Sequence, residues 1–82
     1  MKISKDMYLD LANLMQNYRD FDNVSVQNTY TTKFKFKSGF ACLVSRNEKN
    51  NNKLSVHFEK RESDPTAYKI IMDALTDDNG NS

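Results

Sequence analysis

The sequence predicts an α+β fold in which two amphipathic helices flank an antiparallel meander and cover one face of its sheet. Apolar residues recur at helical spacing near both ends of the chain and alternate with polar residues through the middle. The chain has 82 residues, which is enough for one small domain only. Because both helices must bury their apolar stripes, we expect them on the same sheet face, with the other face open to solvent.

The first helix is expected over residues 5–19. Ser4 is placed to cap its N-terminus, since a serine hydroxyl accepts an otherwise unpaired backbone N–H group. Asp6 lies in the first turn, where a negative charge suits the helix dipole. The predicted apolar stripe consists of Met7, Leu11, Leu14, Met15 and Tyr18.

Three or four strands are expected in the middle of the chain, because apolar and polar residues alternate there with a period of two. Ser38-Gly39 predicts a two-residue hairpin loop. The expected order is a turn at 20–23, strands at 24–26 and 30–37, the Ser38-Gly39 loop, a strand at 40–45, a polar loop at 46–53 and a strand at 54–59.

The second helix is expected to start near residue 65. Asp64 or Ser63 serves as its cap, and Pro65 suits the first helical position. Its apolar face consists of Tyr68, Ile71, Met72 and Leu75. The domain is therefore expected over residues 1–76, followed by a flexible acidic tail at 77–82.

The strand register decides which side chains face solvent, since a slip of one residue exchanges the two faces. Phe34 and Phe36 are too large and apolar to leave in water, so their face is expected to be the core. A two-residue loop then sends Ala41 and Leu43 inward with them. The predicted outer face carries Lys33, Lys35, Lys37, Phe40, Cys42, Val44, Ser55, His57 and Glu59.

The middle of the chain is strongly basic. Residues 32–61 hold eight basic residues against two acidic ones, whereas residues 62–82 hold one basic residue against five acidic ones. A row of lysines beside an exposed apolar strip favours an anionic or acidic partner. This charge distribution is more informative than the net charge of +1.

The sequence does not predict an enzyme, a cofactor or a metal site. One Cys and one His are too few for a zinc site, and two glycines cannot build a phosphate-binding loop. The predicted register places Cys42 and His57 opposite each other, as a nucleophile and its base would be. No third residue orients that pair, so a half-buried thiol beside a surface imidazole is the better interpretation.

We therefore expect a non-enzymatic regulatory protein that inhibits or modulates a larger protein or ribonucleoprotein by covering one of its surfaces, plausibly an acidic surface. Small proteins of this kind are frequent among phage and mobile-element accessory proteins that act on host or defence machinery. Self-association through a sheet face carrying Val44 or through an edge strand is a further alternative. The candidate binding residues are Lys33, Lys35, Lys37, Phe40, Val44, Arg46, Lys49, Lys53 and His57.

Binding of RNA or single-stranded DNA is the alternative function. In that case lysines hold phosphates and Phe40 stacks on a base. The stretch Lys37 to Leu43 faintly resembles the first ribonucleoprotein signature of RNA-recognition-motif domains. It departs from that signature in an inserted Ser38 and in Cys42, which replaces the second stacking aromatic residue, so no family is assigned.

The expected location is the cytoplasm, or the host cytoplasm if the protein is phage-encoded. A single cysteine, Cys42, cannot form an internal disulfide, which favours a reducing compartment. No secretory signal is recognisable, because Asp6 and Asp10 interrupt the N-terminal stretch. The longest apolar run, Phe40 to Val44, is far too short for a membrane span.

Overall fold

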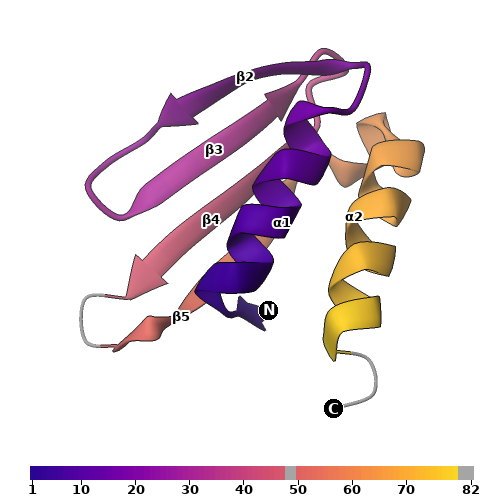
Figure 1. The fold of residues 1–82 in the computed structure, drawn as a ribbon. Coiled ribbons are helices and arrows are strands. Elements are labelled where there is room, and N and C mark those ends of the chain that lie inside the picture. The colour runs from indigo at the N-terminus through magenta and orange to yellow at the C-terminus, as the bar shows by residue number, and fades with distance from the viewer. Residues whose placement is uncertain (48–49, 80–82) are drawn as a thin grey trace.

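The computed structural model describes residues 1–47 and 50–79 as a two-layer α+β domain, which confirms the predicted fold class. Both helices lie on one face of a five-stranded antiparallel sheet with the strand order β1-β5-β4-β3-β2 (Figure 1). The elements are β1 (Lys2–Ile3), α1 (Lys5–Gln16), β2 (Phe21–Val26), β3 (Thr31–Phe36), β4 (Ala41–Asn47), β5 (Asn50–Glu59), the 3-10 helix η1 (Arg61–Ser63) and α2 (Pro65–Asn79).

Helix α1 begins where the sequence predicts. The backbone N–H of Met7 donates a hydrogen bond to Ser4 Oγ at 3.2 Å, so Ser4 is the N-cap. Leu11 and Met15 of the predicted stripe are buried. The helix ends at Gln16, three residues earlier than predicted.

The early end of α1 lets the chain turn back into the sheet at Phe21. The Phe21 N–H donates to Tyr18 O at 3.0 Å and closes this turn. The Phe21 ring then packs against Phe34 and Phe36, with centroid distances of 6.5 and 5.6 Å. The turn predicted at 20–23 therefore lies at 17–20, and residues 21–23 belong to β2, because packing of the partly buried Phe21 ring draws this segment into the sheet.

Helix α2 is capped by Asp64, as predicted. Its Oδ1 accepts the Ala67 backbone N–H at 3.1 Å. The same carboxylate also accepts the hydroxyl of Tyr18 from the turn after α1 and the hydroxyl of Ser38 from the β3–β4 loop, each at 3.4 Å. One side chain therefore joins three segments that are far apart in sequence.

Helix α2 is longer than predicted. It continues to Asn79, so the first three residues of the expected tail at 77–82 belong to the helix. Residues 80–82 lie outside the described residues. No helix in the described part of the chain is long and apolar enough to cross a membrane.

The β3–β4 hairpin differs from the prediction by one residue, with consequences for the whole site. The Phe36 N–H donates to Phe40 O at 2.9 Å, and the Gly39 N–H donates to Phe36 O at 3.0 Å. The loop therefore contains three residues, 37–39, and not two. Gly39 has a φ of +97°, which a residue without a Cβ adopts at little cost.

This register reverses the predicted faces of β4. Lys35 pairs with Ala41, and Phe34 and Phe58 both pair with Cys42. Phe40, Cys42 and Val44 consequently lie under the helices, while Ala41 and Leu43 face the other way. The predicted inward positions on β3 and β5 are correct, so only the central strand was assigned to the wrong faces.

The aromatic rings of the core gather around Phe40, which is 0% exposed. Its centroid lies 5.0 Å from Phe36, 5.9 Å from Phe58 and 6.4 Å from Tyr68 of α2. Phe40 therefore links three strands to the second helix. The buried apolar residues are Ile3, Leu11, Met15, Phe34, Phe36, Phe40, Ala41, Cys42, Leu43, Val44, Leu54, Val56, Ala67, Ile71 and Leu75.

The expected polar loop at 46–53 is mostly strand. β4 extends to Asn47 and β5 begins at Asn50, and these two residues pair after a register shift. The short strand β1 was not predicted. It pairs with β5 through Lys2 opposite Ser55 and brings buried Ile3 to the core.

Candidate functional site

The sheet face opposite the helices is uncovered, and we call it the open face. Alternate residues of each strand point toward it, and the strand pairing aligns them in rows. Its paired residues are Lys2, Asn23, Ser25, Thr31, Lys33, Lys35, Ala41, Leu43, Ser45, Ser55, His57 and Glu59. Lys53 lies two residues before Ser55 on β5, and Lys37 directly follows β3.

Hydrogen-bonded hydroxyl groups form one row across the open face. Lys2 Nζ donates to Ser55 Oγ at 3.1 Å, and Thr31 Oγ1 lies 2.8 Å from Ser45 Oγ. Ser45 pairs with both Thr31 and Ser55, so the row spans β1, β5, β4 and β3. Small hydroxyl side chains keep this part of the face flat.

The apolar centre of the open face is closed to solvent although no helix covers it. Leu43 is 7% exposed and Ala41 is 2% exposed. Lys33 pairs with Leu43, Glu59 pairs with Ala41, and Lys33 Nζ lies 2.8 Å from Glu59 Oε1. This ion pair therefore crosses β4 above the two apolar side chains, and the aliphatic stem of the lysine shields them from water.

The Lys33 hydrogen bond lowers the pKa of Glu59 from its ordinary value, with a further contribution from the Lys33 charge. We expect Lys33→Met, which keeps an aliphatic stem, to raise the pKa of Glu59 in an NMR pH titration. Lys35→Met serves as the control and should leave that pKa nearly unchanged. Because the folded-state pKa is lowered, the contribution of the pair is present at neutral pH and is lost as the pH falls through the titration of Glu59.

The net charge of the open face is positive. Lys2, Lys33, Lys35, Lys37 and Lys53 contribute basic groups against Glu59, which Lys33 already neutralises. No Phe or Tyr lies on this face within the described residues. The face can therefore attract an anionic surface but offers no phenyl ring for stacking on a base.

The structure separates the predicted site residues. Lys33, Lys35 and His57 lie on the open face, as predicted, and Lys37 follows the last residue of β3. Lys53 was expected in a polar loop but belongs to β5, at the same alternation as Ser55 and His57. The prediction that Phe40 and Val44 form its apolar centre was wrong, because the three-residue loop turns both under the helices, where they are 0% and 4% exposed. The faint ribonucleoprotein signature loses its stacking residue for the same reason.

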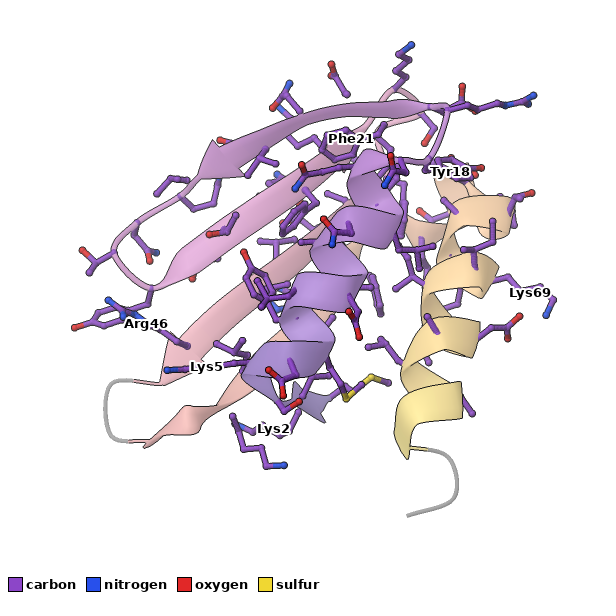
Figure 2. The ribbon with its side chains drawn as sticks, viewed as in Figure 1. Lys2, Lys5, Tyr18, Phe21, Arg46 and Lys69 are labelled. Atoms are coloured by element: carbon purple, nitrogen blue, oxygen red, sulfur yellow. The ribbon has the colours of Figure 1, made fainter. Side chains whose placement is uncertain are left out.

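Arg46 also lies on the helix side of the sheet. Its guanidinium carbon is 5.4 Å from the centre of the Tyr30 ring, and Figure 2 shows it at the end of β4 that is remote from α2. Lys49 lies outside the described residues. The predicted cluster of basic side chains on a 46–53 loop is therefore not brought together around Arg46.

The Cys42–His57 arrangement does not exist in the fold. Cys42 points under the helices and pairs with Phe58, whereas His57 pairs with Leu43 and faces the open side. Desolvation raises the pKa of the Cys42 thiol to about 12. Among the described residues no three His, Cys, Asp or Glu side chains are grouped to hold a metal ion.

Sequence reasoning missed the hydroxyl row of the open face. Lys2 was missed because a strand of two residues gives no measurable alternation. Ser45 was included in a predicted strand, but its face followed from the wrong register. The alternation of Ser55, His57 and Glu59 was the signal that identified the β5 part of this face.

No protein-family model, curated protein or solved structure matches this chain. The candidate site therefore stands on its geometry and charge alone.

Proposed function

We propose that this protein is a non-enzymatic binding protein that modulates a larger protein by covering one of its acidic surfaces with the open face. The observation that carries the proposal is the charge of that face: its lysines lie on a common side, and Glu59, the one acid on the face among the described residues, is already paired with Lys33. A flat basic surface of this kind accelerates and orients encounter with an acidic partner.

The helix layer supports a directional mode of binding. Asp6 and Asp10 on α1 and Asp73 on α2 are exposed on the opposite side of the molecule. Lys69 of α2 is paired with Asp73 at 2.9 Å and points away from the sheet (Figure 2). Lys5 offsets one of these charges and Lys69 neutralises Asp73, so the helix layer has little net charge and an acidic partner is attracted mainly by the sheet layer.

The lack of Phe and Tyr on the described part of the open face favours a protein partner over single-stranded nucleic acid. Base stacking on an aromatic side chain contributes about 1–3 kcal/mol per base, and the ring expected to provide it, Phe40, is in the core. The buried, free thiol of Cys42 is compatible with the reducing cytoplasm that we propose as the setting.

Reversing two charges on the open face tests the proposal. We expect Lys35→Glu with Lys37→Glu to reduce recovery of a protein partner from extract of the source cell roughly tenfold or more, because each change replaces attraction with repulsion. The matched control is Lys5→Glu with Lys69→Glu, which changes the net charge equally on the helix layer. Recovery is measured by quantitative mass spectrometry with the tagged wild-type chain as reference.

Two outcomes contradict the proposal. Equal recovery by all three proteins would show that the partner binds elsewhere. Loss of the partner after nuclease treatment, together with a steep fall of binding with salt, would identify nucleic acid as the ligand. Far-UV circular dichroism of both variants confirms that the fold is retained.

A further inference from the structure

The second surface of interest is the outer edge of β2, the last strand of the sheet (Figure 1). In the part of the chain that the structure describes, no strand pairs with this edge. Natural edge strands are commonly protected by lysine, proline or a covering segment. β2 contains neither Lys nor Pro, and its one irregularity lies at its beginning, between Phe21 and Asn23.

The backbone of β2 presents two residues to a further strand. Gln27 N–H donates to Thr31 O of β3 at 2.9 Å. Ser25 and Asn23 lie two and four residues before Gln27 and pair with β3, so their backbone groups point the same way. Antiparallel pairing alternates the direction of the backbone groups along a strand. The N–H and C=O groups of Val24 and Val26 therefore point to the free edge.

The side chains of the same two residues are exposed. Val24 and Val26 lie on the helix side, since they pair with Phe34 and Thr32. They are 42% and 75% exposed, and Val26 is the most exposed large apolar side chain among the described residues. Figure 1 shows the loop ends of β2 and β3 extending past α1, which leaves this part of the helix side uncovered.

We propose that β2 pairs with β2 of a second copy of this chain, antiparallel, across a two-fold axis at Ser25. Only an axis at residue 24, 25 or 26 keeps both valines near the centre of the paired segment. An axis at residue 24 places Asp22 opposite Val26 of the second copy. An axis at residue 26 places Val24 opposite Asn28 of the second copy. Only the axis at Ser25 places valine opposite valine at both positions.

The charges of the strand agree with this register. Ser25 meets Ser25 of the second copy on the open-face side, and Asn23 meets Gln27 of the second copy. Asp22 meets Asn28 of the second copy, so no like charges are opposed. Four main-chain hydrogen bonds and a cluster of four valines form at once, because a two-fold axis uses each contact twice.

The dimer joins the two sheets edge to edge and places both open faces on one side. This arrangement doubles the basic surface available to a partner. The pairing itself depends only on the β2 edge, so it stands or falls independently of the proposed function.

Molecular mass in solution tests the pairing. By analytical ultracentrifugation over a concentration series, we expect the wild-type chain to rise from 9.5 kDa toward twice that mass. Val26→Lys should remain monomeric over the same series, because a charge replaces the apolar contact at an already exposed position. Ile70→Lys on α2 is the matched control and should dimerise like the wild type.

Cysteine cross-linking tests the register. Ser25 and its counterpart form a pair without mutual hydrogen bonds, with Cα atoms ~4.5 Å apart, a distance that a disulfide can span. We expect Ser25→Cys to form a disulfide-linked dimer under mild oxidation. Asn23→Cys, on the same strand and face, should not, since its neighbour across the axis is Gln27 of the second copy.

Three results would overturn the proposal. A mass of one chain at every concentration excludes the dimer. A dimer that Val26→Lys leaves intact must use another surface. Cross-linking of Asn23→Cys as fast as Ser25→Cys excludes the axis at Ser25. The buried thiol of Cys42 is common to all of these proteins and does not interfere with the comparison.

Discussion

We expect Phe40→Ala to lower the free energy of unfolding by about 3–5 kcal/mol, the usual range for truncating a buried aromatic residue. The Phe40 side chain is 0% exposed, and its ring contacts Phe36, Phe58 and Tyr68. For 82 residues the total stability is roughly 4–12 kcal/mol, so this single change removes at least about a quarter of it. Urea denaturation followed by circular dichroism measures the change.

Two further variants make this result decisive. Phe40→Leu removes less volume and should give a smaller loss that is measurable even if Phe40→Ala does not fold. Lys35→Ala, on the neighbouring strand but facing solvent, should change stability by less than about 0.5 kcal/mol. An unchanged urea midpoint in Phe40→Leu and Phe40→Ala would return residue 40 to the surface and restore the two-residue loop.

The second large effect concerns the reactivity of Cys42. The thiol is buried, and desolvation raises its pKa to about 12. A thiol reagent such as dithionitrobenzoate must therefore wait for the structure to open. We expect labelling of the native protein to be at least about a thousandfold slower than labelling in urea, given the stability usual for a domain of this size. Ser38→Cys in a Cys42→Ala background should react rapidly.

The same thiol predicts a loss of stability at alkaline pH. The folded-state pKa is raised, so the native protein keeps the proton while the unfolded chain loses it above pH 9. The free energy of unfolding should therefore fall between about pH 9 and 12, by ~1.4 kcal/mol per pH unit from this group. Cys42→Ala lacks this contribution, so an equal slope in both proteins would contradict the burial of the thiol.

The fold class was predictable because local sequence signals mark the helix starts and the alternation of the strands. Ser4 caps α1 and Asp64 caps α2 in the structure as in the sequence pattern. The regular alternation around Phe34 and Phe36 fixed the buried face of β3. These features depend on neighbours in sequence and need no knowledge of tertiary packing.

The faces of β4 were not predictable from alternation, because this strand is apolar on both sides. Its two possible inward sets are Ala41 with Leu43 and Phe40 with Cys42 and Val44. Both are compatible with a turn at Ser38 and Gly39, and the choice between two and three loop residues decides between them. Side-chain volume was the neglected signal, since the set with the phenyl ring fills the space beneath two helices better.

The candidate site inherited this error only in part. Lys33, Lys35 and His57 face the open side in either register, because β3 and β5 keep their faces when β4 shifts. Phe40 and Val44 depended on β4 and were wrong. The alternation of residues along β3 and β5 therefore predicts the basic side chains of the open face. That Ala41 and Leu43 form its centre beneath the Lys33–Glu59 ion pair is known only from the structure.

The carboxylate of Asp64 has a consequence for how this hairpin keeps a single alignment. It accepts hydrogen bonds from the start of α2, from Tyr18 in the turn after α1 and from the hydroxyl of Ser38 in the β3–β4 loop. A sliding β4 would pull Phe40 out from beneath Tyr68 and also displace Ser38 from this acceptor. The hydrogen bond in the turn and the packing of Phe40 against α2 therefore disfavour the same shifted register. The apolar pattern of β4 alone would allow both registers, and these two contacts together select one.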